Sequence, residues 1–305
     1  MKLRIFLPAV IAMAVMTGCA QPSAPSESVP AETEQPPETE QPAETGTGED
    51  EEITIEAGDH KIYGTYTAPD GEYDSAVLLL HGYGADRQVG GMFRDFAEVL
   101  KDECKMASFR FDMRAVRQIG DDGFTQYTLA EGSKDTTKSL KWLRQTHPGI
   151  RHIYILGHSM GGTIAIMNEA ENAGMYDGAV TWAGAADLTV LYTPEQLEQA
   201  RTDGYYRMEL DWKDYPIYLP LEWFEEVENL DLPALSAKGK APLLAVNGKL
   251  DATVPFETGQ KLTEVRSDER SLALVYEEAD HMFRNTRDGL YRDTAEYLSS
   301  LDQSE

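Results

Sequence analysis

The sequence predicts an α/β fold, in which a mostly parallel sheet carries helices on both of its faces. Short apolar runs alternate along the chain with segments of helical periodicity, which is typical of parallel strands joined by crossover helices. Several of these runs are apolar at every position, as expected of strands that are buried on both faces. With 305 residues, of which 41% are hydrophobic, the chain is long enough for one large domain with a substantial core.

Residues 1–18 are predicted to be a secretory signal. Basic residues precede an apolar run from Ile5 to Val15, which is too short to remain as a membrane span. The segment ends in Met16-Thr17-Gly18-Cys19, which resembles the lipobox of bacterial lipoproteins. The resemblance implies that Cys19 becomes the lipidated N-terminus of an exported protein, anchored at the bacterial cell surface. The alternative is a plain signal peptide that is followed by a coincidental cysteine.

Residues 19–52 are predicted to be a lipid-anchored, disordered acidic linker, and residues 53–305 to be the folded domain. Pro, Glu, Thr, Ser and Gln dominate the linker, which has no aromatic and no basic residue. Such a composition buries too little apolar surface to offset the entropy lost on ordering. The chain as a whole carries a net charge of −26. This charge disfavours nucleic acid and anionic membrane surfaces, so we expect no nucleic-acid partner and a membrane contact through the lipid anchor only.

The folded domain is predicted to begin with a hairpin. Ile53–Ile55 and Lys61–Tyr66 alternate apolar and polar residues on either side of a Gly-Asp turn. Further strands are predicted at Ala76–Leu80, Ala107–Phe111, Ile153–Leu156, Ala179–Trp182, Leu243–Val246 and Leu272–Tyr276. Helices are predicted at Met92–Cys104, at Leu129–Thr146, from about Gly161 onward, and at Gly289–Leu301.

The alternation of strand and helix breaks in residues 188–240. This stretch is richer in aromatic residues than the rest of the chain and holds Tyr192, Tyr205, Tyr206, Trp212, Tyr215, Tyr218, Trp223 and Phe224. A solvated loop would not need these rings, so the stretch is interpreted as a small cap inserted over the end of the sheet. Its aromatics either form the core of the cap or line a confined pocket, in which Tyr206 and Trp212 are the candidate substrate-binding residues.

The segment Gly157-His158-Ser159-Met160-Gly161 stands between a predicted strand and a predicted helix. It fits the G-x-S-x-G pattern of a nucleophile elbow, in which a sharp strand-to-helix turn holds the serine hydroxyl clear of the backbone. The flanking glycines avoid side-chain clashes in so tight a turn. The helix N-terminus presents unpaired N–H groups to a developing negative charge. Ser159 is therefore the candidate nucleophile, and the Met160 amide is a candidate oxyanion-hole donor.

Four stretches of the domain resemble the α/β-hydrolases: His81–Gly84, Gly157–Gly162, Asn247–Pro255 and Ala279–Phe283. They occur in the order of that superfamily, and the resemblance covers the chain from about Ile53 to Leu301. It implies an eight-stranded, mostly parallel sheet with a small cap between the sixth and seventh strands. Within the superfamily the chain is most similar to bacterial carboxylesterases of the feruloyl or cinnamoyl type. This similarity implies a serine esterase that hydrolyses small or hydroxycinnamoyl-type carboxylic esters through an acyl-enzyme.

A serine hydroxyl needs a base to take its proton, and the base needs an acid to orient it. Among the six histidines, only His281 follows the elbow at a distance, in a loop after the last predicted strand. Asp251 follows the strand Leu243–Val246, and the helix and strand between it and His281 would bring both loops to one edge of the sheet. Asp280 is the rival by proximity, but adjacent residues rarely aim their side chains at one another. The predicted triad is therefore Ser159, Asp251 and His281.

The resemblance also implies that the loop after the third strand supplies the second oxyanion-hole donor, the Tyr83 amide. His81 is predicted to brace this loop. His158, beside the nucleophile, is predicted to be a structural residue that points away from it, and His60 to be a surface or turn residue. The sequence has no pattern typical of a metal site, a dinucleotide fold or a phosphate loop, so no metal and no cofactor is expected.

Other functions stay open at the level of the sequence. The same fold and triad serve lipases, lysophospholipases and serine peptidases, and a lipoprotein can use a hydrolase fold only to bind a ligand or partner. A binding protein would usually have lost one of the three triad residues, and all three are present here. Hydrolysis of an ester is therefore the leading hypothesis.

Overall fold

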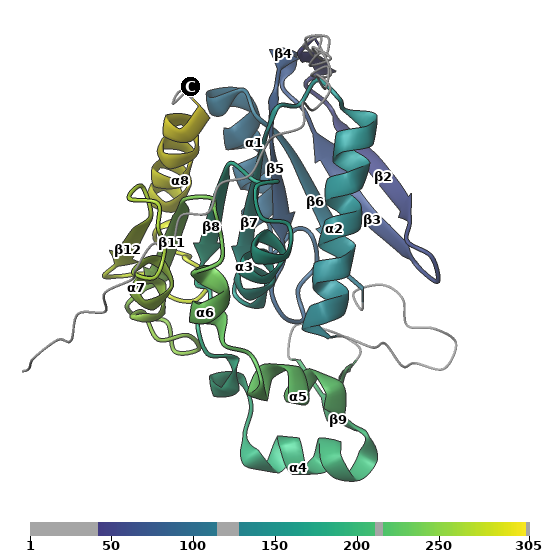
Figure 1. Cartoon of the computed structure of the whole chain (residues 1–305), viewed down its shortest axis with the longest axis vertical. Helices are drawn as coiled ribbons and strands as arrows, with labels where there is room; N and C mark the ends of the chain where they lie inside the picture. Colours follow the sequence, from purple (N-terminus) through teal and green to yellow (C-terminus); the bar gives the residue numbers. More distant parts are fainter. Residues whose placement is uncertain (1–41, 115–127, 211–215, 303–305) are drawn as a thin grey trace, which may run out of the picture. The chain divides into compact units, whose positions relative to one another are not determined.

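An eight-stranded, mostly parallel sheet lies at the centre of the folded domain (Figure 1). The structure is a computed structural model that describes residues 42–114, 128–210 and 216–302, so the predicted signal peptide, Cys19 and the linker up to residue 41 lie outside the described residues. The strands in spatial order are β12 (Leu272–Tyr276), β11 (Leu243–Gly248), β8 (Gly178–Trp182), β7 (His152–His158), β5 (Ser75–Leu80), β6 (Ala107–Asp112), β3 (Lys61–Thr67) and β2 (Asp50–Glu56). Strand β3 is antiparallel to β2 and β6, and the other pairs described in this sheet are parallel. This arrangement confirms the predicted fold class.

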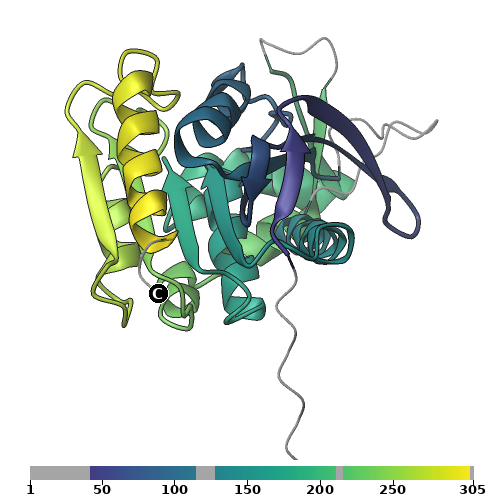
Figure 2. The same ribbon diagram turned by 90° about the horizontal axis from the view of Figure 1, so that it is seen from above.

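Helices cover both faces of the sheet, which explains why its central strands are apolar at nearly every position. Helices α1 (Met92–Val99) and α8 (Arg287–Asp302) lie on one face, and α2 (Leu129–Thr146) lies on the other with α3 (Met160–Glu171) (Figure 2). Every residue of β5, β6, β8 and β11 is buried between these two layers. Helix α1 continues as a π-helical turn, Leu100–Cys104. In the described part of the chain, no helix is long and apolar enough to cross a membrane.

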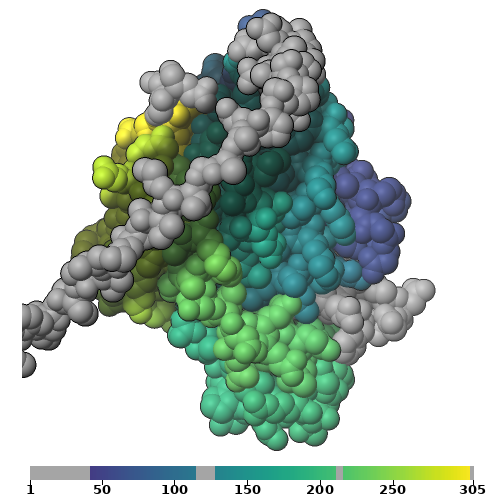
Figure 3. All heavy atoms as spheres, in the orientation of Figure 1, coloured from purple at the N-terminus to yellow at the C-terminus, as the bar shows by residue number. Residues whose placement is uncertain are grey.

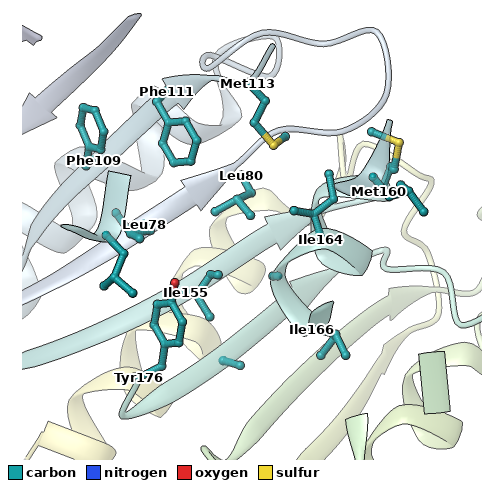
Figure 4. Packing of buried hydrophobic residues seen from close by; sticks show 14 of the residues in the cluster. Leu78, Leu80, Phe109, Phe111, Met113, Ile155, Met160, Ile164, Ile166 and Tyr176 are labelled. Carbon is teal, nitrogen blue, oxygen red and sulfur yellow. The ribbon is translucent and has the colours of Figure 1, made fainter. Parts of the chain in front are cut away.

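The core on the α2 and α3 side holds the elbow in place. Leu78 and Leu80 of β5 and Ile155 of β7 are buried in one cluster with Met160 and Ile164 of α3 (Figure 4). Helix α3 therefore starts against the carboxyl ends of the central strands. The register pairs the last residue of β5 with Gly157 of β7, so the two loops that leave these strands begin side by side.

The folded domain begins earlier than residue 53, the boundary that the sequence analysis predicts. Strand β1 (Glu44–Thr47) pairs with β4 (Asp70–Tyr73), and β2 already starts at Asp50. For β2 the reason is electrostatic. Asp50 accepts a hydrogen bond from Nη2 of the buried Arg110 at 2.6 Å, and Glu52 accepts one from Nη2 of the buried Arg87 at 2.7 Å. Asp50 and Glu52, which the sequence analysis assigns to the linker, therefore balance the charges of buried arginines.

The segment after β8 forms a cap, as predicted. It consists of the 3₁₀ turn Leu188–Leu191, α4 (Pro194–Asp203), the hairpin of β9 (Tyr205–Met208) and β10 (Ile217–Pro220), and α5 (Leu221–Glu228). These elements make up the lobe at the lower end of the molecule (Figure 3). Helix α6 (Leu232–Ser236) already packs against α3 and α7 (Thr258–Thr263), so the cap ends before α6 rather than at Lys240.

Candidate active site

Ser159 lies at the sharp turn between β7 and α3. Its φ of 54° falls in the left-handed region that residues with a side chain rarely adopt. The Ser159 N–H group donates to the Trp182 carbonyl at 2.8 Å and holds the turn. A Cβ at Gly157 would collide with the Gly161 carbonyl, and a Cβ at Gly161 would collide with the Leu80 carbonyl. Glycine at these two positions therefore lets α3 start directly against the end of β5.

The structure joins Ser159, His281 and Asp251 in a continuous chain of hydrogen bonds. Ser159 Oγ lies 3.1 Å from His281 Nε2, and His281 Nδ1 lies 2.7 Å from Asp251 Oδ2. With Nδ1–H donating to the carboxylate, the Nε2 lone pair can accept the serine proton. Asp280, the rival acid, instead accepts hydrogen bonds from the amide and the side chain of Arg284. The geometry therefore brings the three predicted residues together and leaves Asp280 apart.

The Asp251 carboxylate is buried but is held in its ionised form. Its Oδ1 accepts hydrogen bonds from the Thr253 and Val254 amides, at 2.7 and 2.9 Å. Burial raises the pKa of Asp251, but the hydrogen bond and charge of His281, together with these two amides, outweigh burial and leave the pKa below its usual value. An ionised Asp251 fixes the His281 tautomer in which Nε2 can act as a base.

The loop His81–Gly84, which follows β5, packs directly against the elbow. A Cβ at Gly82 would lie 3.0 Å from Ser159 Cβ, so the glycine allows the close approach of the loop to the nucleophile. The Met160 amide is the first of α3, a position at which an N–H group has no intrahelical acceptor. The two predicted oxyanion-hole residues, Tyr83 in the loop and Met160 after the nucleophile, thus lie on segments that meet at Ser159. Their role as donors stays a prediction.

Two further histidines hold the surroundings of the site. His81 Nδ1–H donates to the Gly82 carbonyl at 2.9 Å, and His81 Nε2 accepts from the Met113 amide at 3.0 Å, so this side chain braces the loop as predicted. His60 lies in the turn between β2 and β3, one of the two predicted alternatives, but its side chain is buried rather than on the surface, and its Nε2 lies 2.9 Å from the buried Asp135 carboxylate. The partner of His60 is 75 residues away in α2, and no local pattern around the histidine indicates it.

His158 makes a contact that the sequence did not indicate. Its Nε2–H group donates to the backbone carbonyl of His281 at 3.0 Å, and the two ring centroids are 5.0 Å apart. Burial, followed by the charge of the neighbouring His281 ring, lowers the pKa of His158 to about 3. The imidazole is therefore neutral at neutral pH. The sequence analysis predicted a structural residue that points away from the site, whereas the structure places this ring against the residue that carries the candidate base.

The cap contains one of the two candidate substrate-binding residues within the described part of the chain. Tyr206 Oη lies 3.1 Å from Gln196 Nε2, and the tyrosine is half-buried; Trp212 lies outside the described residues. Trp223 and Phe224 are buried, with ring centroids 5.1 Å apart, so part of the aromatic set forms the core of the cap. The Trp223 ring also lies 6.1 Å from the Tyr83 ring and connects this core to the loop after β5. Contact of Tyr206 with substrate stays a prediction.

Comparison with solved structures places the fold among the α/β-hydrolases. The chain is similar to Est1E from Butyrivibrio proteoclasticus with ferulic acid bound, at 16% identity and a TM-score of 0.65, covering 82% of this chain and 98% of that chain. It is similar to the monoacylglycerol lipase of Paleococcus ferrophilus, at 17% identity and a TM-score of 0.63, covering 79% and 99%. It is also similar to the esterase domain of a Rhodothermus marinus protein, at 16% identity and a TM-score of 0.60, covering 83% and 97%.

Comparison by sequence gives the family. No curated protein matches the chain. Residues 128–303, which contain Ser159, Asp251 and His281, match the prolyl oligopeptidase family. Because this match spans more than half of its length, the chain belongs to the prolyl oligopeptidase family and is a serine hydrolase of the α/β-hydrolase fold.

Proposed function

We propose that this serine hydrolase is a carboxylesterase that hydrolyses small or hydroxycinnamoyl-type esters through an acyl-enzyme. The observation that carries the proposal is the hydrogen-bonded chain from Ser159 Oγ through His281 to the buried Asp251 carboxylate. In such a chain a neutral imidazole activates the hydroxyl toward a carbonyl carbon, and the carboxylate stabilises the imidazolium that forms.

In the first half of the reaction, Ser159 Oγ attacks the carbonyl carbon of the ester as His281 Nε2 accepts its proton. The carbonyl oxygen becomes negatively charged, and the Tyr83 and Met160 amides are the groups that would donate hydrogen bonds to it. The tetrahedral intermediate collapses when Nε2–H gives its proton to the leaving alkoxide, which departs as the alcohol. The acyl group remains on Ser159 as an ester.

In the second half, His281 Nε2 accepts a proton from a water molecule, whose oxygen attacks the acyl carbon. The new tetrahedral intermediate expels Ser159 Oγ, which takes the proton back from Nε2, and the carboxylic acid leaves. Asp251 stays ionised through both halves, because its pKa is held below its usual value. It therefore stabilises the imidazolium twice in each turnover.

The composition of the cap supports a preference for esters with short or flat acyl groups. Its aromatic residues are mixed with charged ones, such as the ion pair of Arg207 with Glu209, whereas lipase lids tend to expose broad aliphatic surfaces. Rings with polar tips suit a confined pocket in which an acyl group is buried and its hydroxyls are hydrogen-bonded. Est1E, which shares the fold, binds ferulic acid in its solved structure. We expect kcat/KM to fall for acyl chains beyond about eight carbons, as such a pocket runs out of room.

A peptidase is the second candidate, because the family to which the chain belongs is that of an oligopeptidase. The triad chemistry is the same, except that His281 would then protonate an amine as the leaving group. A lipase is the third candidate, since the monoacylglycerol lipase of Paleococcus ferrophilus shares the fold.

A panel of substrates separates these candidates. We would measure kcat/KM for p-nitrophenyl esters of increasing chain length, hydroxycinnamoyl esters, long-chain glycerides and peptidyl p-nitroanilides, with Ser159→Ala as the control. The proposal predicts the highest values for short-chain or hydroxycinnamoyl esters, and loss of all hydrolysis in Ser159→Ala. Highest values for peptidyl amides would establish the peptidase instead. Activation at the interface of long-chain glycerides would establish the lipase.

A further inference from the structure

His158 belongs to the elbow and lies beside two further segments of the candidate active site, the His281 loop and the loop after β5. It precedes the nucleophile on the elbow, and its Nε2–H group donates to the His281 carbonyl at 3.0 Å. A Cβ at Gly82 would lie only 3.3 Å from His158 Nδ1, so the loop after β5 passes directly beside the ring. We propose that His158 is a positioning residue, whose imidazole holds the loop of His281 at the distance from Ser159 that proton transfer requires. This inference rests on the proposed function, because it concerns the same triad.

The hydrogen bond from His158 links the backbone of His281 to the elbow. Other backbone hydrogen bonds join the His281 loop to itself, as from the Phe283 amide to Asp280, or to the Asp251 loop, as from the Leu250 amide to the Ala279 carbonyl at 3.0 Å. Ser159 and His281 are 122 residues apart, so their relative position depends on contacts between the two loops. A displacement of about 1 Å in such a pair can lower the rate about 100-fold.

The surroundings of His158 suit a side chain that stays a hydrogen-bond donor at neutral pH, rather than a second base that accepts protons. Its Nδ1 is buried and has no hydrogen-bond partner among the described residues, so the single proton of the neutral ring belongs on Nε2, where the His281 carbonyl accepts it. Burial first, and then the charge of the His281 ring, lower the pKa of His158 to about 3, so this donor does not titrate above pH 5. A neutral ring also adds no repulsion when His281 becomes an imidazolium.

Three substitutions separate the hydrogen bond from the volume of the ring. His158→Gln places an N–H donor at a similar reach and should keep kcat within about fivefold of the wild type. His158→Phe fills the space without a donor and should lower kcat about 100-fold while KM stays unchanged. If His158→Phe fails to fold, His158→Asn takes its place, because the shorter side chain cannot reach the His281 carbonyl. His147→Gln, which changes a histidine at the opposite end of the sheet, is the matched control and should keep the wild-type kcat.

Wild-type kcat in His158→Phe, or an equal loss in His158→Gln and His158→Phe, would overturn the positioning role. A second measurement is independent of turnover: the proton NMR signal of the His281 Nδ1–H group in its hydrogen bond with Asp251. We expect this signal to be preserved in His158→Gln and shifted or lost in His158→Phe. An identical signal in both variants would also refute the proposal. If the wild type hydrolyses no substrate, the proposed function fails, while the NMR comparison still decides whether His158 positions His281.

Discussion

At the scale of single residues, the Asp251 carboxylate determines which tautomer His281 adopts in the predicted triad. Its pKa lies below its usual value because the hydrogen bonds to its carboxylate outweigh burial. The folded-state pKa is thus lower than that of the unfolded chain, which is about 3.9. The contribution of Asp251 to stability is therefore fully present above pH 4 and is lost as the pH falls through the folded-state value. Acidification that stays above pH 4 should therefore leave the Asp251 carboxylate ionised.

The amide variant Asp251→Asn should lower kcat about 10⁴-fold, because an amide at this position favours the wrong tautomer of His281. Asp280→Asn is the matched control, since the Asp280 carboxylate binds Arg284 rather than His281. Steady-state kinetics on a short-chain ester measure both variants. Full activity in Asp251→Asn together with loss of activity in Asp280→Asn would reassign the acid to Asp280.

At the scale of helices and strands, Glu226 of α5 connects the cap to the core. Its Oε2 accepts a hydrogen bond from the Leu129 amide at the N-terminus of α2, at 2.6 Å. Burial nevertheless raises the pKa of Glu226. A raised pKa means that the folded state binds this proton more readily than the unfolded state. The ionised carboxylate therefore lowers stability at neutral pH, and this penalty disappears as the pH falls through the folded-state pKa to below the unfolded value of about 4.3.

Glu226→Gln should raise the Tm at pH 7, because the amide keeps an acceptor oxygen without the buried charge. The difference from the wild type should vanish below about pH 4, where the carboxyl is protonated. Glu226→Ala leaves the Leu129 amide without its acceptor and should lower stability by about 1 kcal/mol. Glu225→Ala, an exposed change on the same helix, is the control for thermal unfolding. A Gln variant that is less stable than the wild type at pH 7 would contradict the inferred penalty.

The sequence predicts those elements well whose own residues carry a characteristic pattern. Apolar runs mark the inner strands β5, β7, β8 and β11, and the elbow has both its glycines and its flanking strand and helix. Strands β1 and β4 have no apolar run, and they form because each is the partner of the other. The bonds of His60 with Asp135 and of His158 with His281 join residues 75 and 123 positions apart, so only the tertiary structure reveals them. The contact of Ser159, His281 and Asp251 could be predicted because superfamily order and sheet topology fix where their loops meet.

At the scale of the whole chain, the acidic residues before residue 53 determine where the folded domain starts. A chain that begins at residue 42 keeps Asp50 and Glu52 beside Arg110 and Arg87 and should be folded and active. A chain that begins at residue 53 leaves the buried Arg110 without its counter-charge and should be less stable by about 3 kcal/mol. Urea unfolding of the two shortened chains makes the comparison. Equal stability would show that residues 42–52 do not contribute to the fold.

The sequence also predicts a lipid anchor at Cys19, outside the described residues. Expressed with its own leader, the protein should partition with membranes, and Cys19→Ser should release it. A single acyl chain binds membranes only marginally, so a stable anchor needs more than one. Mass spectrometry of the mature N-terminus checks the modification. An unmodified cysteine at that position would contradict the lipoprotein prediction.

The most direct test of the proposed function is to trap the acyl-enzyme. The protein is mixed with a hydroxycinnamoyl ester, quenched with acid within one turnover, digested and examined by mass spectrometry. The proposal predicts the mass of the acyl group on the peptide that contains Ser159, and no such addition in Ser159→Ala. Hydrolysis of the ester without acylation of Ser159, or acylation of a different residue, would contradict the proposed mechanism.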